Sequence, residues 1–158
     1  MLRLSPVDNN RLFQNGALEG CFGGGEANVA VSLAQLGDEA VFVSKFPQNA
    51  VGEAALRTLK GYGVNTSHIL WGGKRMGIYY MEKGASQRPS VCIYDRMGSS
   101  FQTSRPEEYC WKEIMQGVQW FHFTGITPAL GKDLASACLD ACRAAKEAGA
   151  TISCDLNY

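Results

Sequence analysis

The sequence predicts an α/β fold with a mostly parallel sheet covered by helices. Strand-like and helix-like segments alternate over residues 25–63 and again over 107–158, which is typical of consecutive βα units. Hydrophobic residues make up 46% of the 158-residue chain, which is enough to form a core. Two strand-like runs over 75–95 interrupt the alternation and indicate a β insertion beside the ligand crevice.

Each element is assigned from the spacing of its apolar residues and from its boundaries. The helix after Gly25 is the clearest, because alanine and leucine recur at helical spacing up to a terminal Gly37. Residues 2–4 are interpreted as the tail of a strand whose start is missing or very short. In chain order we expect further strands over 12–22, 40–43, 64–70, 75–81, 90–94, 118–123 and 150–154, and helices over 26–37, 52–59, 106–115 and 133–148.

The charge balance excludes two classes of partner. Fifteen basic residues match fifteen acidic ones, so we expect neither a nucleic acid nor an anionic membrane surface as partner. The longest uncharged run, 117–131, is too short to span a bilayer, and the first residues form no apolar signal region. The expected ligand is a small molecule or another protein.

The six cysteines indicate a reducing compartment. They include no CxxC pair, and only two histidines are present, so no metal site is expected. Cys138 and Cys142 are four residues apart and could form a disulfide, but buried free thiols are the favoured interpretation. The expected location is therefore the cytoplasm.

Three consecutive glycines, 23–25, precede the clearest helix. Glycines allow a ligand to approach the backbone, and a helix start offers free N–H groups. The dinucleotide fingerprint fails because Asn28 stands where it requires glycine, and the phosphate-loop motif fails because Arg75 follows Gly73-Lys74. A plain turn and a ligand contact both remain open. In the second case the Asn28 amide would meet a polar ligand over Gly24 and Gly25.

Tyr79, Tyr94 and Arg96 form a second candidate group on the hairpin. Tyr94 and Arg96 are two residues apart, so they share one face of a strand. A tyrosine ring can cover the C–H side of a sugar, and a guanidinium suits a carboxylate. From spacing alone, an exposed hairpin with amphipathic side chains is the favoured interpretation.

Polar residues also follow the last two expected strands. Asp155-Leu156-Asn157-Tyr158 and Thr124-Gly125-Ile126-Thr127 stand where open α/β sheets bind ligands. For the first segment a disordered terminus is the alternative. His122 lies inside an apolar strand, so a core histidine is favoured over a catalytic one.

Several segments together resemble the ribokinase-like (PfkB) sugar kinases, over nearly the whole chain. They are 1–6, Gly23-Gly24-Gly25-Glu26-Ala27-Asn28-Val29-Ala30, 63–68, 123–130 and 155–158. Within that superfamily the chain most resembles 2-keto-3-deoxygluconate kinases, on the segments 77–84, 88–90 and 93–96. The resemblance implies the N-terminal part of an αβα sandwich over 1–158, with a small β lid formed by strands about 12–22 and 75–96.

The resemblance also implies roles for individual residues. Gly24, Gly25, Asn28, Tyr79, Tyr94 and Arg96 would contact the sugar, with Arg96 a candidate partner for its carboxylate. Asn157 would belong to the cofactor site. ATP and magnesium would be the cofactors of the intact enzyme, and pairing of lids would make a homodimer. The intact protein would phosphorylate 2-keto-3-deoxygluconate to its 6-phosphate.

Two departures limit what this chain is expected to do alone. The family's catalytic aspartate lies in a GAGD-type segment that is absent here and is expected beyond Tyr158, and the NxxE-type segment tied to magnesium is absent too. We therefore expect no kinase activity from the 158 residues alone. A kinase of fructose or 2-keto-3-deoxygalactonate, a non-catalytic sugar-binding module and a fragment without a role remain as alternatives.

Overall fold

The structure is a computed structural model of the chain and describes residues 1–157. The strands are β1 (Leu2–Pro6), β2 (Leu18–Phe22), β3 (Ser44–Phe46), β4 (Ile69–Trp71), β5 (Ile78–Glu82), β6 (Val91–Asp95), β7 (Trp120–Thr124) and β8 (Thr151–Asp155). The helices are α1 (Gly25–Leu36), α2 (Ala50–Gly61), α3 (Trp111–Ile114), α4 (Ile126–Ala129) and α5 (Lys132–Glu147), with a 3₁₀ turn at Pro106–Glu108. The expected alternation of helices and strands is confirmed.

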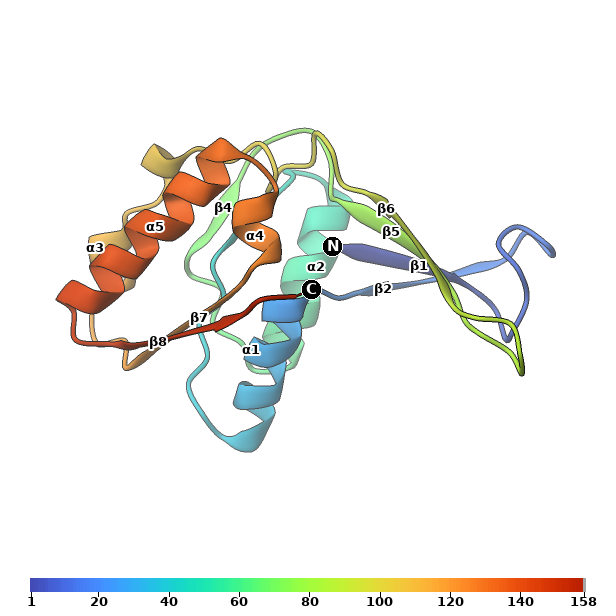
Figure 1. Cartoon of the computed structure of the whole chain (residues 1–158), viewed down its shortest axis with the longest axis horizontal. Coiled ribbons are helices and arrows are strands. Elements are labelled where there is room, and N and C mark those ends of the chain that lie inside the picture. Colours follow the sequence, from blue (N-terminus) through green and yellow to red (C-terminus); the bar gives the residue numbers. More distant parts are fainter. Residues whose placement is uncertain (158) are drawn as a thin grey trace.

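Among the described residues the strands form three hydrogen-bonded groups (Figure 1). One sheet has the order β2-β1-β5-β6, in which only the β1–β5 pair is parallel. The pairs β3–β4 and β7–β8 are parallel, as βα units require. Figure 1 shows the four-stranded sheet reaching away from the helices as an arm. The predicted hairpin is its β5–β6 half, and β1 pairs with both β2 and β5 in this sheet.

Two apolar clusters hold the helices against the parallel pairs. The first lies between α1, α2, β3 and β4, and it contains Ala30, Ala55, Leu59, Phe46 and Ile69 among others. Leu2 and Phe22 pack against this cluster, which anchors the base of the four-stranded sheet. The second cluster joins α5 to β7 through the fully buried Ala141 and Ala145. The amphipathic pattern predicted for 133–148 explains this packing, since one face of α5 carries these small residues.

Two predicted elements are wrong, one observed element was not predicted, and two strands are shorter than expected. The strands predicted over 12–22 and 64–70 are confined to Leu18–Phe22 and Ile69–Trp71. Residues 40–43 form a single bridge, between Val41 and Asn65, and the strand lies at Ser44–Phe46 instead, where the register opposite β4 begins. The helix predicted over 106–115 is broken at Tyr109, which is extended and buried and stacks on Trp111 with ring centroids 5.1 Å apart. The single turn α4 was not predicted at all.

The described cysteines agree with the expectation of free thiols. All six thiols are free, and burial raises the pKa of Cys138 to about 12, so that thiol stays protonated. Cys138 and Cys142 are therefore not linked. Within residues 1–157, no helix has the length and apolar character needed to cross a membrane.

Candidate functional site

Aromatic and basic side chains form one row across the four-stranded sheet. Tyr79 of β5 stands opposite Tyr94 of β6, and their stacked rings have centroids 6.0 Å apart. The Arg96 guanidinium lies over the Tyr94 ring, with its carbon 4.6 Å from the centroid. Cross-strand partners share a face, so the three side chains present one continuous surface. The sequence places Tyr94 and Arg96 together, and the register adds Tyr79 to them.

The glycine segment contacts this row directly. A Cβ atom added at Gly23 would lie 3.0 Å from the Tyr79 hydroxyl, so the hydroxyl lies close to the backbone there and a side chain at this position would crowd it. Gly24 has φ of 155°, which favours glycine, and a Cβ on Gly25 would lie 3.2 Å from Thr124. A different local constraint thus favours glycine at each of the three positions. Together the three residues connect the sheet to the start of α1.

Both tyrosine hydroxyls keep their protons at neutral pH. Burial raises the pKa of Tyr79, and the Arg3 guanidinium offsets part of that rise. The neighbouring Cys92 side chain is the main cause that raises the pKa of Tyr94, with burial contributing. Protonated phenols can donate to a ligand oxygen as well as accept from a hydroxyl. The row therefore offers donors, aromatic surface and positive charge.

The ends of β7 and β8 are tied to the same glycine segment. Glu26, in the first turn of α1, accepts hydrogen bonds from Thr124 Oγ1 at 2.7 Å, Thr124 N at 3.2 Å and Thr127 Oγ1 at 2.9 Å. Thr124 is almost completely buried. Glu26 was not among the predicted site residues, because no local pattern indicates a hydrogen bond to a residue 98 positions away. Glu26 and the two threonines thus form a structural link.

We expect Glu26→Ala to destabilise the chain by about 3 kcal/mol, because it leaves two buried donors of Thr124 without an acceptor. Urea denaturation followed by circular dichroism measures the change. Glu53→Ala is the matched control, since Glu53 stands in the first turn of α2 and is exposed. Its loss is limited to the helix dipole, about 0.5 kcal/mol. Equal losses for the two variants would contradict the structural link.

The remaining candidates lie at the edge of this junction. Asn28 is exposed one turn into α1, where its backbone N–H donates to the Gly24 carbonyl at 2.8 Å. Asn157 follows β8 in a left-handed conformation and is exposed, with its N–H bonded to Asp155 Oδ1 at 3.1 Å. Leu156 precedes Asn157, and a Cβ on Gly125 would lie 2.4 Å from its carbonyl oxygen, so a larger residue than glycine would clash there. The roles of Asn28 and Asn157 stay predictions.

His122 is half-buried on β7, with its Nδ1 2.8 Å from the Ser153 hydroxyl on β8. Ser153 also accepts a hydrogen bond from Trp120 Nε1 at 2.8 Å. These contacts give His122 a partner within the sheet, as the core interpretation requires.

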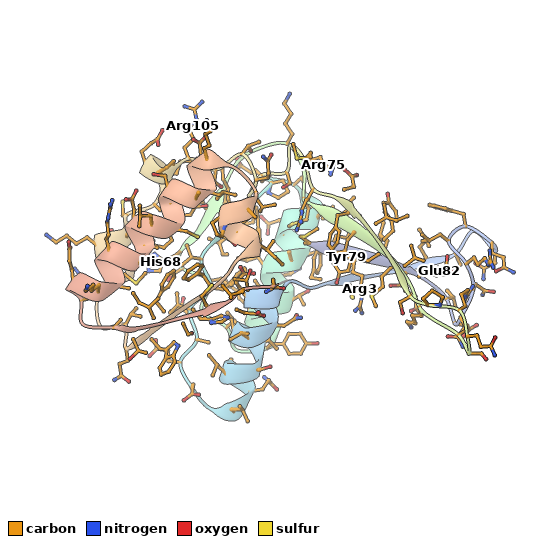
Figure 2. The ribbon with its side chains drawn as sticks, in the orientation of Figure 1. Arg3, His68, Arg75, Tyr79, Glu82 and Arg105 are labelled. Carbon is orange, nitrogen blue, oxygen red and sulfur yellow. The ribbon has the colours of Figure 1, made fainter. Side chains whose placement is uncertain are left out.

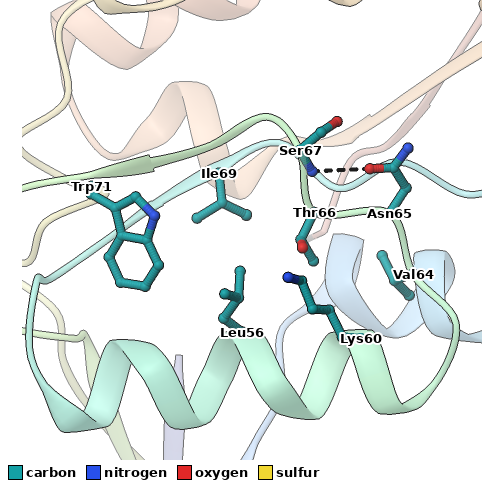
Figure 3. A pocket seen from close by; sticks show the side chains of 8 residues that line it. All are labelled: Leu56, Lys60, Val64, Asn65, Thr66, Ser67, Ile69 and Trp71. Atoms are coloured by element: carbon teal, nitrogen blue, oxygen red, sulfur yellow. Dashed lines mark hydrogen bonds between the residues drawn. The ribbon is translucent and has the colours of Figure 1, made fainter.

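A hollow of about 580 Å³ lies away from all these residues, between α2 and the segment leading to β4 (Figure 3). Its walls are Leu56, Lys60, Val64, Asn65, Thr66, Ser67, Ile69 and Trp71. Figure 3 shows Asn65 turned back onto the Ser67 N–H, a bond of 2.9 Å that is local to the turn. None of the candidate residues lines this hollow, so it does not define the site.

The comparisons with known proteins agree with this architecture. The family model described as pfkB family carbohydrate kinase matches residues 3–158. The crystal structure of 2-dehydro-3-deoxygluconokinase from Thermotoga maritima is 51% identical, with a TM-score of 0.98, over 100% of this chain and 48% of that one. A 2-dehydro-3-deoxygalactonokinase from Haloferax volcanii is 37% identical over 100% of this chain and 49% of its own length. A 2-dehydro-3-deoxygluconokinase from Bacillus subtilis is 32% identical over 85% of this chain and 41% of its own.

The α/β body with its projecting sheet thus matches the fold of solved carbohydrate kinases. The chain belongs to the pfkB family of carbohydrate kinases. The predicted family and its ribokinase-like α/β fold are confirmed. The chain spans about half the length of the relatives that it matches.

Proposed function

We propose that this chain forms the sugar-binding part of an ATP-dependent kinase that phosphorylates 2-keto-3-deoxygluconate (2-dehydro-3-deoxygluconate) on its 6-hydroxyl. The observation that carries the proposal is the row of Tyr79, Tyr94 and Arg96, whose Tyr79 hydroxyl lies next to the backbone of Gly23. The names of the Thermotoga and Bacillus relatives support the same sugar acid.

Each group of the row has a part in binding a sugar acid. The Arg96 guanidinium would pair with the carboxylate, since the structure gives Arg96 no ion pair with any described residue. The rings of Tyr79 and Tyr94 would cover the C–H side of the carbon chain. Their hydroxyls and the Asn28 amide would bond the sugar hydroxyls, while Gly24 and Gly25 allow the ligand close to the backbone. A neutral sugar would make the same ring contacts and hydrogen bonds but no ion pair with Arg96.

ATP with magnesium is the proposed phosphoryl donor of the whole protein. Among residues 1–157, no group of three or more His, Cys, Asp or Glu side chains converges in a way that could hold a metal ion. No step through the metal is assigned to these residues. We place the catalytic aspartate in sequence beyond Tyr158 and keep Asn157 as a cofactor-side residue. The part described here binds and orients the sugar, and we propose a cytoplasmic location for it.

Isothermal titration of the chain with three sugars tests the proposal. We expect 2-keto-3-deoxygluconate to bind at least tenfold more tightly than fructose, because only the acid has a charge for Arg96. Fructose binding as tightly as the acid, or no binding of either, would refute it. Incubation with ATP and 2-keto-3-deoxygluconate is expected to give no ADP from the chain alone, and binding without turnover of the whole protein would favour a non-catalytic module.

A second candidate substrate is 2-keto-3-deoxygalactonate, which the name of the Haloferax relative favours. The two acids differ at one carbon, so Arg96 binds either. The same titration compares the affinities of the two acids. Tighter binding of 2-keto-3-deoxygalactonate would change the proposed substrate, while the substrate class would still be a sugar acid.

The proposed homodimer uses the other face of the four-stranded sheet. Ile93 and Val91 are 50% and 42% exposed there, and Phe13 packs near Tyr80 with ring centroids 6.3 Å apart. Exposed apolar residues on an edge strand are typical of a covered surface. We expect Ile93→Glu to shift the chain from dimer to monomer in light scattering after gel filtration. Leu139→Glu is the control, since Leu139 is equally exposed on α5. A monomeric parent chain would refute this interface.

A further inference from the structure

We propose that Arg3 is a second cation of the sugar site and bonds the sugar acid directly, from the side of Tyr79 that is away from Arg96. This inference rests on the proposed function and adds a residue to it. Arg3 lies on β1, opposite Tyr79 of β5 and opposite Cys21 of β2. The row of cross-strand neighbours therefore continues through Arg3, and Figure 2 shows Arg3 and Tyr79 beside each other.

Arg3 is a guanidinium without an ion pair among residues 1–157, and it lies within a strand of this sheet. Arg75 pairs with Asp95 at 2.7 Å, and Arg88 pairs with Glu82 at 3.4 Å. Within residues 1–157, Arg3 forms no ion pair, and neither does Arg96. The two unpaired guanidiniums thus stand at opposite ends of the stacked Tyr79–Tyr94 pair. Adjacent strands lie about 4.8 Å apart. Arg3 on β1 and Arg96 at the end of β6 are two such spacings apart in the sheet, which leaves room for a six-carbon chain between the two guanidiniums.

A hollow of about 450 Å³ opens at Arg3. It is lined by Arg3, Ser5, Glu19, Gly20, Cys21 and Lys83. Ser5 is 5% exposed, and its buried hydroxyl has no hydrogen-bond partner among the described residues. A buried hydroxyl without a partner is costly, and a ligand oxygen would satisfy it. Two cations and one carboxylate, Glu19, face the hollow, so its net charge favours an anionic polyol.

No local pattern in the sequence connects residues 2–4 with the hairpin, so Arg3 was not among the predicted site residues. Only the parallel pairing of β1 with β5, across more than 70 residues, brings Arg3 next to Tyr79. Ser5 shares the face of Arg3 because the two are two residues apart on one strand. The charge on Arg3 and the hydroxyl of Ser5 would therefore act on the same end of the ligand.

Binding of 2-keto-3-deoxygluconate by variants tests the inference. We expect Arg3→Gln to weaken binding of the acid at least tenfold, with Arg3→Lys restoring part of the loss. Fructose binding should weaken by a similar factor, because the single carboxylate is assigned to Arg96 and the end of the ligand at Arg3 has hydroxyls in both sugars. Arg57→Gln, an exposed position on α2, is the charge-matched control and should leave both affinities unchanged. An unchanged affinity for the acid in a folded Arg3→Gln chain would overturn the inference and leave the proposed function intact.

A double variant separates direct contact from an effect through Tyr79. If Arg3 only orients the Tyr79 hydroxyl, Arg3→Gln should have no further effect in a Tyr79→Phe chain. Direct contact predicts a further loss of at least fivefold, and no further loss would overturn it.

A measurement on the unsubstituted chain covers the case in which Arg3→Gln does not fold. We expect the sugar acid to protect Arg3 from phenylglyoxal in mass spectra, with Arg57 unprotected. Modification of Arg3 at the same rate with and without bound acid would overturn the inference. Absence of acid binding in the parent chain would instead refute the proposed function, and the inference with it.

Discussion

Arg96→Leu is expected to weaken binding of 2-keto-3-deoxygluconate by about 30- to 160-fold, since a hydrogen-bonded charge pair contributes about 2–3 kcal/mol. The loss includes the stacking of the guanidinium on Tyr94, which contributes about 0.5–1 kcal/mol. Isothermal titration measures the affinity. Fructose has no carboxylate, so its binding should fall by less than about fivefold, the part due to stacking alone.

Two further variants sharpen this result. Arg96→Lys keeps the charge but loses the planar stacking and the paired donors, so its affinity for the acid should lie between those of the parent and Arg96→Leu. Arg57→Gln removes one positive charge away from the sheet and should have no effect. Equal weakening of acid and fructose by Arg96→Leu would mean that Arg96 supports the sheet and does not recognise the carboxylate.

Gly52→Ala is expected to destabilise the chain by about 3 kcal/mol, although alanine is normally the better helix former. A Cβ at this buried position in α2 would lie 2.1 Å from the Pro47 carbonyl oxygen and 3.1 Å from the Trp71 ring. The backbone of the preceding turn would have to move, and the Asn49 cap, which bonds the Gly52 N–H at 3.1 Å, would move with it. Urea denaturation followed by circular dichroism measures the change.

The control lies at the other end of the same helix. A Cβ at Gly61 would meet no atom within 4 Å, and we expect Gly61→Ala to stabilise the chain by up to about 1 kcal/mol. The opposite signs of the two substitutions test the packing of α2 against the Pro47 turn. A neutral or stabilising Gly52→Ala would show that this turn lies farther from the helix.

Local patterns were sufficient to predict most elements. The helix over 26–37 was predicted to within one residue, because helical spacing and a terminal glycine are both local signals. The hairpin was predicted from alternation, and alternation also placed Tyr94 and Arg96 on one face. The helix expected over 106–115 failed because the burial of Tyr109 depends on tertiary contacts that no local pattern contains.

The site could be predicted only in pieces. The glycine segment and the Tyr94–Arg96 pair are each visible locally, but their contact through the Tyr79 hydroxyl depends on the pairing of β1 with β5. Arg3 and Glu26 carry no local signal at all. The same pairing puts Arg3 opposite Tyr79. Glu26 accepts hydrogen bonds from threonines about 100 residues away. Residues that act across long sequence separations are the ones that single-sequence reasoning misses.

The bonds from Glu26 to Thr124 and Thr127 constrain the order of events during synthesis on the ribosome. Translation adds about 5–20 residues per second, so the nascent start of α1 waits about 5–20 s for its threonine partners to be made. Until then the carboxylate is without these partners. The junction between the glycine segment and β7 is therefore expected to form only after both parallel strand pairs have left the exit tunnel.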